Sequence, residues 1–263
     1  MKKSLNPILA IFFILFFCGE SFAQSPYKLS RTQDSWLLAS GAVASVTGFA
    51  AQHSVDPLSP GAINRLSRED VNAFDRRATK FYSTGLSTGS DVLVGTMLVF
   101  PAALFISNDV FTIGVMYTET MMFTGAASFI AKGLVHRTRP FAYNPTVPID
   151  KKLAKEARRS FFSGHTAAAF SSAVFMSTVF SAYHPNSKWK PFIWSGSLLA
   201  ASAVGVLRYR SGQHFPTDIF AGAVVGGAFG YLIPYLHKTR TSGLSVAPAS
   251  VGQSAGLTVH YMF

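Results

Sequence analysis

Residues 194–236 read WSGSLLAASAVGVLRYRSGQHFPTDIFAGAVVGGAFGYLIPYL and place a charged segment between two apolar ones. The central part, 208–220, contains two arginines, a histidine and an aspartate, whereas the flanking residues are small and apolar. The flanks have the character of helices that lie in lipid. Because burying charged groups costs free energy, the central residues need partners or a function.

The composition of the whole chain favours a membrane protein. The chain has 263 residues, of which 49% are apolar and only 13% charged, whereas about a quarter of the residues in a soluble domain are charged. The length fits a single domain. The formal net charge of +11 indicates anionic partners such as phosphate esters or anionic lipids, and the apolar segments argue against nucleic acid. We expect no obligate protein partner.

The first 23 residues are typical of a secretory signal peptide. Lys2 and Lys3 precede the apolar run 8–17, and Ser-Phe-Ala at 21–23 supplies small residues before a cleavage site. The only cysteine, Cys18, lies inside this segment. The mature chain is therefore expected to have no disulfide, no thiolate metal site and no cysteine nucleophile.

Three regions follow from this reading of the chain. They are a signal peptide at 1–23, a single helical domain at 24–240 and a C-terminal tail at 241–263. The tail ends in LTVHYMF, whose alternation of apolar residues is typical of a β-strand.

Six apolar segments in the mature chain predict an all-α helical bundle whose helices mostly cross a membrane. These segments are 36–52, 88–106, 110–131, 166–183, 191–207 and 217–236. A soluble bundle of very apolar helices is the alternative, but six such segments in one chain favour the membrane. In the last segment, Gly222, Gly226 and Gly230 recur every four residues, a spacing that lets two helices approach closely.

Two long polar connections separate the apolar segments. Residues 53–82 contain five basic residues among several acids and predict a solvated surface helix. Residues 141–160 also contain five basic residues, and their position between two motifs favours a functional role. Glu119 lies inside the third apolar segment, where we expect it to pair with a neighbouring helix.

Three short stretches place polar groups at the ends of the apolar segments: KGLVHRTRP (132–140), FFSGHTAAAF (161–170) and RYRSGQHFPTDIF (208–220). In the second, Ser163 is a suitable N-cap, and the helix that it begins offers free N–H groups to an anion. In the third, Pro216 suits the first position of a helix. Asp218 then lies in the first turn, close enough to hold one imidazole nitrogen of His214.

These groups together suit phosphoryl transfer. Lys132, Arg139 and Arg208, with a helix N-terminus, form a cradle for a tetrahedral dianion. His165 and His214 supply an acid and a nucleophile or base. Because no run of carboxylates is available to hold Mg²⁺ or Ca²⁺, we expect no metal and no cofactor. Cationic side chains would stabilise the developing charge.

The three stretches resemble the signature motifs of the type-2 phosphatidic acid phosphatase superfamily, whose relatives include bacterial acid phosphatases and vanadium haloperoxidases. The resemblance implies a metal-independent phosphatase that forms a phosphohistidine at His214, oriented by Asp218, while His165 protonates the leaving oxygen. It also implies a set of residues that hold the phosphoryl oxygens: Lys132, Arg139, Ser163, Gly164 and Arg208. The sequence departs from the family pattern at Phe162, where proline is usual, and at Leu207, where serine is usual.

The apolar walls around the motifs suggest a substrate carried by a lipid. Candidates are undecaprenyl diphosphate, a lipid A phosphate, phosphatidic acid and phosphatidylglycerol phosphate. The alternatives are a soluble-type periplasmic acid phosphatase acting on small esters, a vanadium-dependent haloperoxidase and a non-enzymatic membrane protein with a decayed site.

The signal-like segment suggests the bacterial cell envelope, and we expect the inner membrane with the active site facing the periplasm. Six full spans that start from an external N-terminus would instead place Lys132 on the cytoplasmic side. Either the segment 36–52 does not span the membrane, or the face is inverted.

Overall fold

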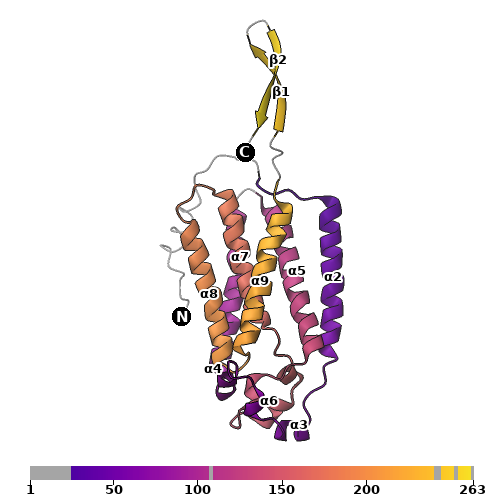
Figure 1. The fold of residues 1–263 in the computed structure, drawn as a ribbon, viewed down its shortest axis with the longest axis vertical. Coiled ribbons are helices and arrows are strands. Elements are labelled where there is room, and N and C mark those ends of the chain that lie inside the picture. Colours follow the sequence, from indigo (N-terminus) through magenta and orange to yellow (C-terminus); the bar gives the residue numbers. More distant parts are fainter. Residues whose placement is uncertain (1–24, 107–108, 240–243, 252–253, 262–263) are drawn as a thin grey trace, which may run out of the picture.

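Six long helices form the body of the protein in a computed structural model, which describes residues 25–106, 109–239, 244–251 and 254–261. The expected signal peptide and the terminal Phe263 lie outside the described residues. The long helices are α2 (Arg31–His53), α4 (Thr84–Val99), α5 (Val110–Val135), α7 (Gly164–Tyr183), α8 (Lys190–Arg210) and α9 (Pro216–His237). They lie along one axis (Figure 1), which confirms the predicted helical bundle.

The helices alternate in direction, so that α5 and α8 end where α7 and α9 begin (Figure 1). The 3₁₀ helix η3 (Phe100–Ile106) continues α4. At the opposite end of the bundle from the starts of α7 and α9, a two-stranded antiparallel hairpin follows α9, with strands β1 (Leu244–Val251) and β2 (Ser254–Tyr261).

Helix α7 lies at the centre of the bundle and packs against α4, α5, α8 and α9. Four segments of the described chain have the length and composition to cross a membrane: Thr84–Leu104, Gly164–Tyr183, Lys190–Arg210 and Pro216–His237. Large apolar side chains on α2, α5, α8 and α9 face outward, among them Trp36, Phe111, Leu199 and Phe220. An apolar exterior of this extent suits contact with lipid rather than water.

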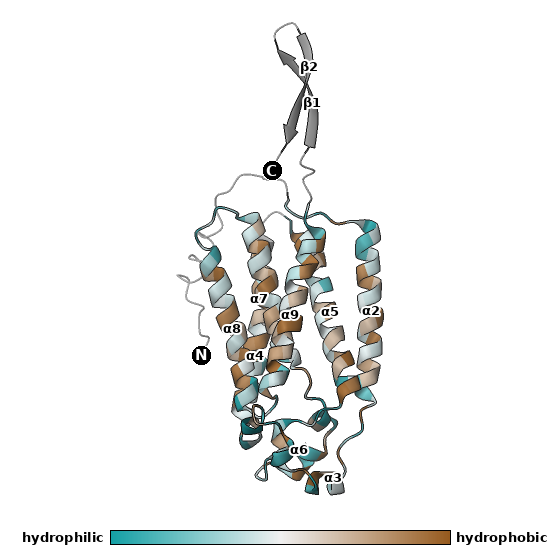
Figure 2. Cartoon of the chain, in the orientation of Figure 1, coloured by the Kyte–Doolittle hydropathy of each residue, from teal (hydrophilic) through white to brown (hydrophobic). Residues whose placement is uncertain are grey.

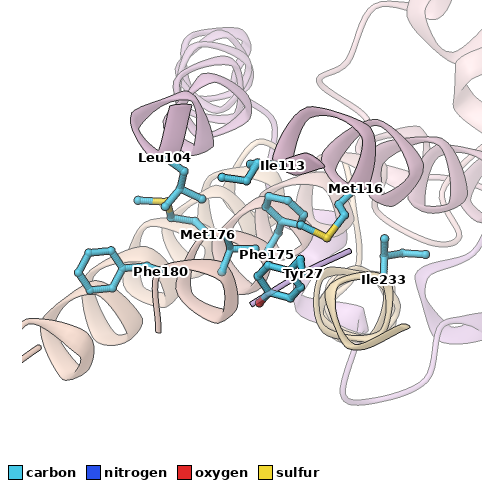
Figure 3. Close-up of a cluster of buried hydrophobic side chains, with 9 residues drawn as sticks. Tyr27, Leu104, Ile113, Met116, Phe175, Met176, Phe180 and Ile233 are labelled. Carbon is cyan, nitrogen blue, oxygen red and sulfur yellow. The ribbon is translucent and has the colours of Figure 1, made fainter. Parts of the chain in front are cut away.

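Two kinds of contact hold the bundle interior. Apolar side chains from α5, α7, α9 and η3 form a buried cluster, shown in Figure 3, in the half of the bundle remote from the start of α7. Elsewhere, hydroxyl groups pair across helices, as in the bonds from Thr124 to Ser171 (2.9 Å) and from Tyr117 to Ser172 (2.7 Å). In lipid such bonds satisfy groups that water cannot reach.

A polar layer of short elements covers the end where α7 and α9 begin (Figure 2). It contains α3 (Pro60–Asn64), η1 (Arg68–Asp70), η2 (Arg76–Lys80), η4 (Pro140–Tyr143), α6 (Ile149–Leu153) and η5 (Lys155–Arg158). The expected surface helix over 53–82 is therefore wrong. Pro57 and Pro60 lack backbone donors, and the side chains of Ser59, Ser67 and Asn72 accept bonds from nearby backbone N–H groups, which favours short turns.

The four-residue glycine spacing places α9 directly against α7. A Cβ atom on Gly222 would lie 2.6 Å from the carbonyl oxygen of Ser163, and one on Gly230 would lie 2.5 Å from that of Ser171. One on Gly226 would overlap with the carbonyl of Ala167. The backbones of the two helices therefore touch, as the spacing predicts.

We expect Gly226→Ala to destabilise the protein by about 2 kcal/mol, because the added methyl group forces α9 away from α7. The matched control is Gly227→Ala, whose Cβ would meet only Val174, at the ordinary distance of 3.8 Å. Thermal unfolding in detergent should show a clear loss for the first variant and little change for the second. Equal effects would contradict the close approach.

Candidate functional site

The ends of α5, α7, α8 and α9 under the polar layer carry the predicted site residues. Lys132 lies in the last turn of α5, and Arg208 lies in the last turn of α8. Ser163 is the N-cap of α7, and Pro216 is the first residue of α9, as the sequence predicts. Because these four helix ends share one side of the bundle (Figure 1), the three motifs converge there.

His214 lies in the turn between α8 and α9 and is 1% exposed. Its Nδ1 atom is 2.8 Å from the carbonyl oxygen of Ser160. A carbonyl oxygen only accepts hydrogen bonds, so Nδ1 carries the proton and Nε2 keeps a free lone pair. The imidazole is thus held in the tautomer that a nucleophile requires.

Asp218 acts on His214 mainly through the residues around it. Its Oδ2 atom is 3.8 Å from His214 Nδ1, farther than a hydrogen bond. The same oxygen accepts bonds from the Ser160 hydroxyl (2.5 Å) and the Phe215 backbone N–H (2.9 Å). Asp218 therefore fixes the two segments that hold the imidazole, and its negative charge remains close to the ring.

Asp218 belongs to an ion network with Arg137 and Asp75. Arg137 donates to Oδ1 of Asp218 at 2.6 Å and to Oδ2 of Asp75 at 2.8 Å, and its guanidinium lies 4.2 Å from the centre of the Phe215 ring. Asp75 also accepts bonds from the hydroxyl and the backbone N–H of Thr217. Both carboxylates are 0% exposed, so Arg137 neutralises charge that water cannot reach.

Asp75, Arg137 and Ser160 also belong to the site, although we did not predict them from the sequence. Asp75 belongs to the connection that we interpreted as a solvated face, and Ser160 acts through its carbonyl as well as its hydroxyl. The one available signal was that Arg137 lies inside the first motif stretch.

Three arginines and a lysine form the cationic side of the site. Arg139 and Arg208 both donate to the side-chain oxygen of Gln213, which lies between them. Lys132 approaches the start of α7, where a Cβ on Gly164 would lie 3.1 Å from its Nζ atom. Arg159, which is not among the predicted site residues, is the third arginine.

The three arginines have buried nitrogens that lack hydrogen-bond acceptors in the described part of the chain. Among the described residues, Nε of Arg139, Nε of Arg208, and Nε and Nη2 of Arg159 are buried side-chain nitrogens with no hydrogen-bond acceptor. Burial and, after it, the positive charge of Arg208 lower the pKa of Arg139 to about 9. Unpaired guanidinium donors and mutual repulsion indicate that this site is built to receive an anion.

His165 lies in the first turn of α7 beside an acid that the sequence analysis did not single out. Its Nε2 atom is 2.8 Å from Oδ1 of Asp91, on α4. Arg208 donates to the same oxygen at 3.2 Å. Asp91 therefore connects the proposed acid to the cationic cradle.

A cavity of about 400 Å³ adjoins Arg139 and Gln213. The start of α4 and the segment 139–156 line it, with Thr84, Ser87, Lys151 and Glu156 on its walls. The cavity gives an anionic group a route to the arginine pair. Arg210, the extra cation of the third motif, instead stacks over the Phe81 ring at 4.6 Å and is exposed.

The turn that carries Gln213 and His214 depends on one glycine. Gly212 has a φ of +72°, a conformation that side chains disfavour, and a Cβ there would overlap with the carbonyl of Phe81. Its carbonyl accepts a bond from Phe141 N–H at 2.9 Å, which joins the third motif to the first.

We expect His214 to remain neutral, with the proton on Nδ1, at and below the pH at which an ordinary histidine becomes protonated. Burial lowers its pKa well below 6.5, and the charges of Arg139 and Arg208 lower it further, against the opposing influence of Asp218. Nitrogen NMR of isotope-labelled histidine, assigned with His214→Gln, measures this directly. A ring that titrates near its ordinary pKa would contradict the burial-driven shift.

Comparisons with known proteins agree with these motifs. A family model for the PAP2 superfamily matches residues 113–242. The chain is 29% identical over 152 residues to a lipid A 4'-phosphatase from Bacteroides thetaiotaomicron, covering 56% of this chain and 63% of that one. It is 36% identical over 88 residues to the bacitracin transport permease protein BcrC from Bacillus licheniformis, covering 34% and 37%.

One further sequence relative and one solved structure are also similar to this chain. The chain is 30% identical over 112 residues to a probable diacylglycerol pyrophosphate phosphatase from Schizosaccharomyces pombe, covering 37% of this chain and 40% of that one. A solved PAP2-type phosphatidylglycerolphosphate phosphatase from Bacillus subtilis aligns with a TM-score of 0.40 and 17% identity, over 77% of this chain and 94% of that one. Each sequence match spans less than two thirds of the relative's own length.

The region that matches the family model contains all three motif stretches, from Lys132 to Asp218. The structure brings these stretches together at one end of the helical bundle, where Arg139 and Gln213 line the cavity. Because motifs, region and geometry agree, residues 113–242 of the chain belong to the PAP2 superfamily.

Proposed function

We propose that the protein is a membrane phosphatase that hydrolyses a phosphate monoester or diphosphate carried by a lipid, through a phosphohistidine at His214. The observation that best supports this proposal is the tautomer of His214. The bond from its Nδ1 to the Ser160 carbonyl leaves Nε2 with a lone pair. The buried guanidinium groups of Arg139 and Arg208 supply the positive charge that a phosphoryl group needs.

The reaction proceeds in two displacements. Nε2 of His214 attacks phosphorus, and the bond from phosphorus to the leaving oxygen breaks as His165 donates a proton to that oxygen. A water molecule then attacks the phosphohistidine and gives a proton to His165, which restores both histidines and releases inorganic phosphate. Asp91, at 2.8 Å from Nε2 of His165, accepts a hydrogen bond from this acid and orients its ring.

The cradle holds the phosphoryl oxygens from three sides. Arg139 and Arg208 exchange their bond to Gln213 for bonds to the substrate, and Lys132 adds a charge beside Gly164. The start of α7 leaves the N–H groups of Gly164 and His165 without intrahelical acceptors, and these donate to an anion. Ser163 contributes as the buried N-cap that sets this helix start.

A lipid substrate is supported by the position of the site. The long helices that lead to the cradle expose apolar side chains on their outer faces. The phosphate site therefore lies at one end of the apolar surface of the bundle. Two of the relatives are named for phosphate groups carried by lipids: lipid A and diacylglycerol pyrophosphate.

Phosphate release by the detergent-purified protein tests the proposal. The substrates are undecaprenyl diphosphate, lipid A, phosphatidic acid, phosphatidylglycerol phosphate and p-nitrophenyl phosphate, each with EDTA. Cleavage of a lipid in EDTA, retained by His184→Ala at the far end of α7, supports the proposal. Cleavage of the small ester alone would contradict the lipid substrate, and bromide oxidation with added vanadate but no phosphate release would contradict the phosphatase.

We place the protein in the bacterial inner membrane with the catalytic end facing the periplasm. Tyr27 pairs with Lys238 at the opposite end of the bundle from Pro216. This orientation requires Tyr27 to lie on the cytoplasmic side. It is therefore an alternative to the cleaved signal peptide expected at 1–23, which would leave residue 24 on the periplasmic side. Single cysteines introduced beside Arg65 or beside Lys238, in a chain without Cys18, distinguish the two orientations. Labelling of the first site in intact spheroplasts supports the periplasmic face, and labelling of only the second contradicts it.

A further inference from the structure

We infer that a divalent metal ion, zinc or manganese, binds between α2, α5 and α9 at the end of the bundle opposite the phosphatase site. The ligands are Asp34 of α2, Glu119 of α5 and His237 of α9, which are 8%, 0% and 2% exposed. Their candidate ligand atoms all lie within 4.8 Å of one another. Glu119 is separated from Lys132 by about 20 Å along α5, so the cluster is independent of the phosphatase chemistry.

The orientation of His237 is that of a metal ligand. Its Nδ1 atom is 2.8 Å from the carbonyl oxygen of Ile233, so Nδ1 carries a proton. Its Nε2 atom faces Oδ1 of Asp34 at 3.0 Å and Oε2 of Glu119 at 3.3 Å. A neutral imidazole would direct a lone pair at two carboxylates, which requires a cation between them. Histidines that bind metals donate their second ring N–H to an acceptor in this way.

Glu119 supplies an observation independent of this orientation. Neither of its carboxylate oxygens has a hydrogen-bond partner among the described residues, although the side chain is fully buried. With both carboxylates ionised, an imidazolium at His237 would leave the cluster with a net negative charge in the bundle interior. A divalent ion with a neutral imidazole makes the cluster neutral and gives Glu119 a bond that it otherwise lacks.

The distances between the ligand atoms and the chemistry of the ligands indicate which metals the cluster would bind. Ligand atoms bound to a tetrahedral ion at about 2.0–2.1 Å lie about 3.3 Å apart, which agrees with the separations around His237 Nε2. One imidazole and two carboxylates suit zinc or manganese and leave one position for water. Asp34 is already fixed, because its second oxygen accepts a bond from Ser30 N–H at 2.9 Å.

The ligands could not be found by sequence spacing. Asp34 and His237 lie in the first and last of the long helices, and Glu119 lies in the third apolar segment. Our expectation that Glu119 pairs with another helix is confirmed by its approach to His237. The proposed ion would join α2 to α5 and α9 as a structural site, and the expectation of a metal-free reaction at His214 is unaffected.

Metal content and unfolding of the purified full chain test this inference. The protein is stripped with a chelator, incubated with zinc or manganese chloride, desalted, and analysed by elemental mass spectrometry and thermal unfolding. We expect about one ion per chain and a higher melting temperature after reconstitution. Glu119→Gln and His237→Gln should lose the ion, whereas His184→Gln and Asp56→Asn, outside the cluster, should retain it.

A second measurement uses the wild-type protein alone and does not depend on the folding of any variant. Nitrogen NMR of labelled histidine should show the His237 ring neutral and shifted at Nε2 when zinc is added. A doubly protonated His237 ring that zinc does not change would overturn the inference, since a proton would then occupy the cluster. Retention of the ion by His237→Gln would overturn it as well. Neither outcome bears on phosphate release, which depends on His214.

Discussion

His214→Ala should release no phosphate above background from any ester, a loss of at least about 10⁴-fold. In the proposed mechanism the imidazole forms the bond to phosphorus, and no described side chain beside it is free to replace it. Asp91 and Asp218 are committed to the acid and to the loop around His214. Because the His214 side chain is buried, its removal also leaves the Ser160 carbonyl without its donor, so the folded state of the variant is checked by thermal unfolding.

Detection of the covalent phosphohistidine provides the decisive test of His214 as the nucleophile. His165→Asn should form the phosphohistidine rapidly from p-nitrophenyl phosphate, whose leaving group needs little protonation, and should hydrolyse it slowly. Radiolabelled substrate should therefore leave acid-labile, alkali-stable label on this variant. The double variant that also carries His214→Ala should remain unlabelled. Label that persists in the double variant would place the nucleophile elsewhere.

Arg137→Met should destabilise the folded protein by about 3 kcal/mol, the largest loss we expect from a residue that does not contact substrate. Arg137 bonds to both Asp75 and Asp218, and both carboxylates are 0% exposed. Without the guanidinium, two negative charges remain buried and repel each other. Activity should fall as well, because Asp218 holds the segments that position His214.

Thermal unfolding of three variants measures this effect. Arg137→Lys should lie between the wild type and Arg137→Met, because lysine keeps the charge but cannot bond to both acids at once. Arg77→Met, an exposed arginine in η2, is the matched control and should behave as the wild type. A melting temperature of Arg137→Met equal to that of Arg77→Met would contradict the role of the network.

The pH dependence of stability gives the same network an independent test. Burial alone would raise the pKa of Asp75, but hydrogen bonds from Thr217, Asn72 and Arg137 outweigh it and hold the pKa below 3.8. A depressed pKa contributes stability that is present above the unfolded value and is lost as pH falls through the folded value. In Arg137→Met the depression is smaller, so the stability should be lost at a higher pH than in the wild type.

The sequence was sufficient for features that depend on local chemistry. The N-cap at Ser163, the helix start at Pro216 and the glycine spacing of α9 each follow from rules that act within a few residues, and the structure confirms them. The bundle followed from the same evidence, because apolar segments of this length have few alternatives. The failure at 53–82 has a local cause too, since prolines and short polar side chains favoured turns over a helix.

The supporting residues could not be found because their partners are distant in the chain. Asp75 bonds to Thr217 and to Arg137, and Asp91 bonds to His165, across separations that no spacing rule covers. The sequence around a charged residue in a polar connection is the same whether its side chain faces water or a buried arginine. Only the folded chain distinguishes the two.

The contact between α7 and α9 determines how the catalytic groups respond to the bilayer. Ser163 N–H donates to the carbonyl of Asp218 at 3.1 Å, and the glycine face of α9 lies on the backbone of α7. The second and third motifs therefore move as one rigid body. Thickness or curvature stress on α2, which exposes apolar side chains such as Trp36 and carries none of the motif residues, would reach the phosphate site only through the contacts of α2 with α5. Such a site should keep its geometry in membranes of different composition, while the path by which a lipid enters would change.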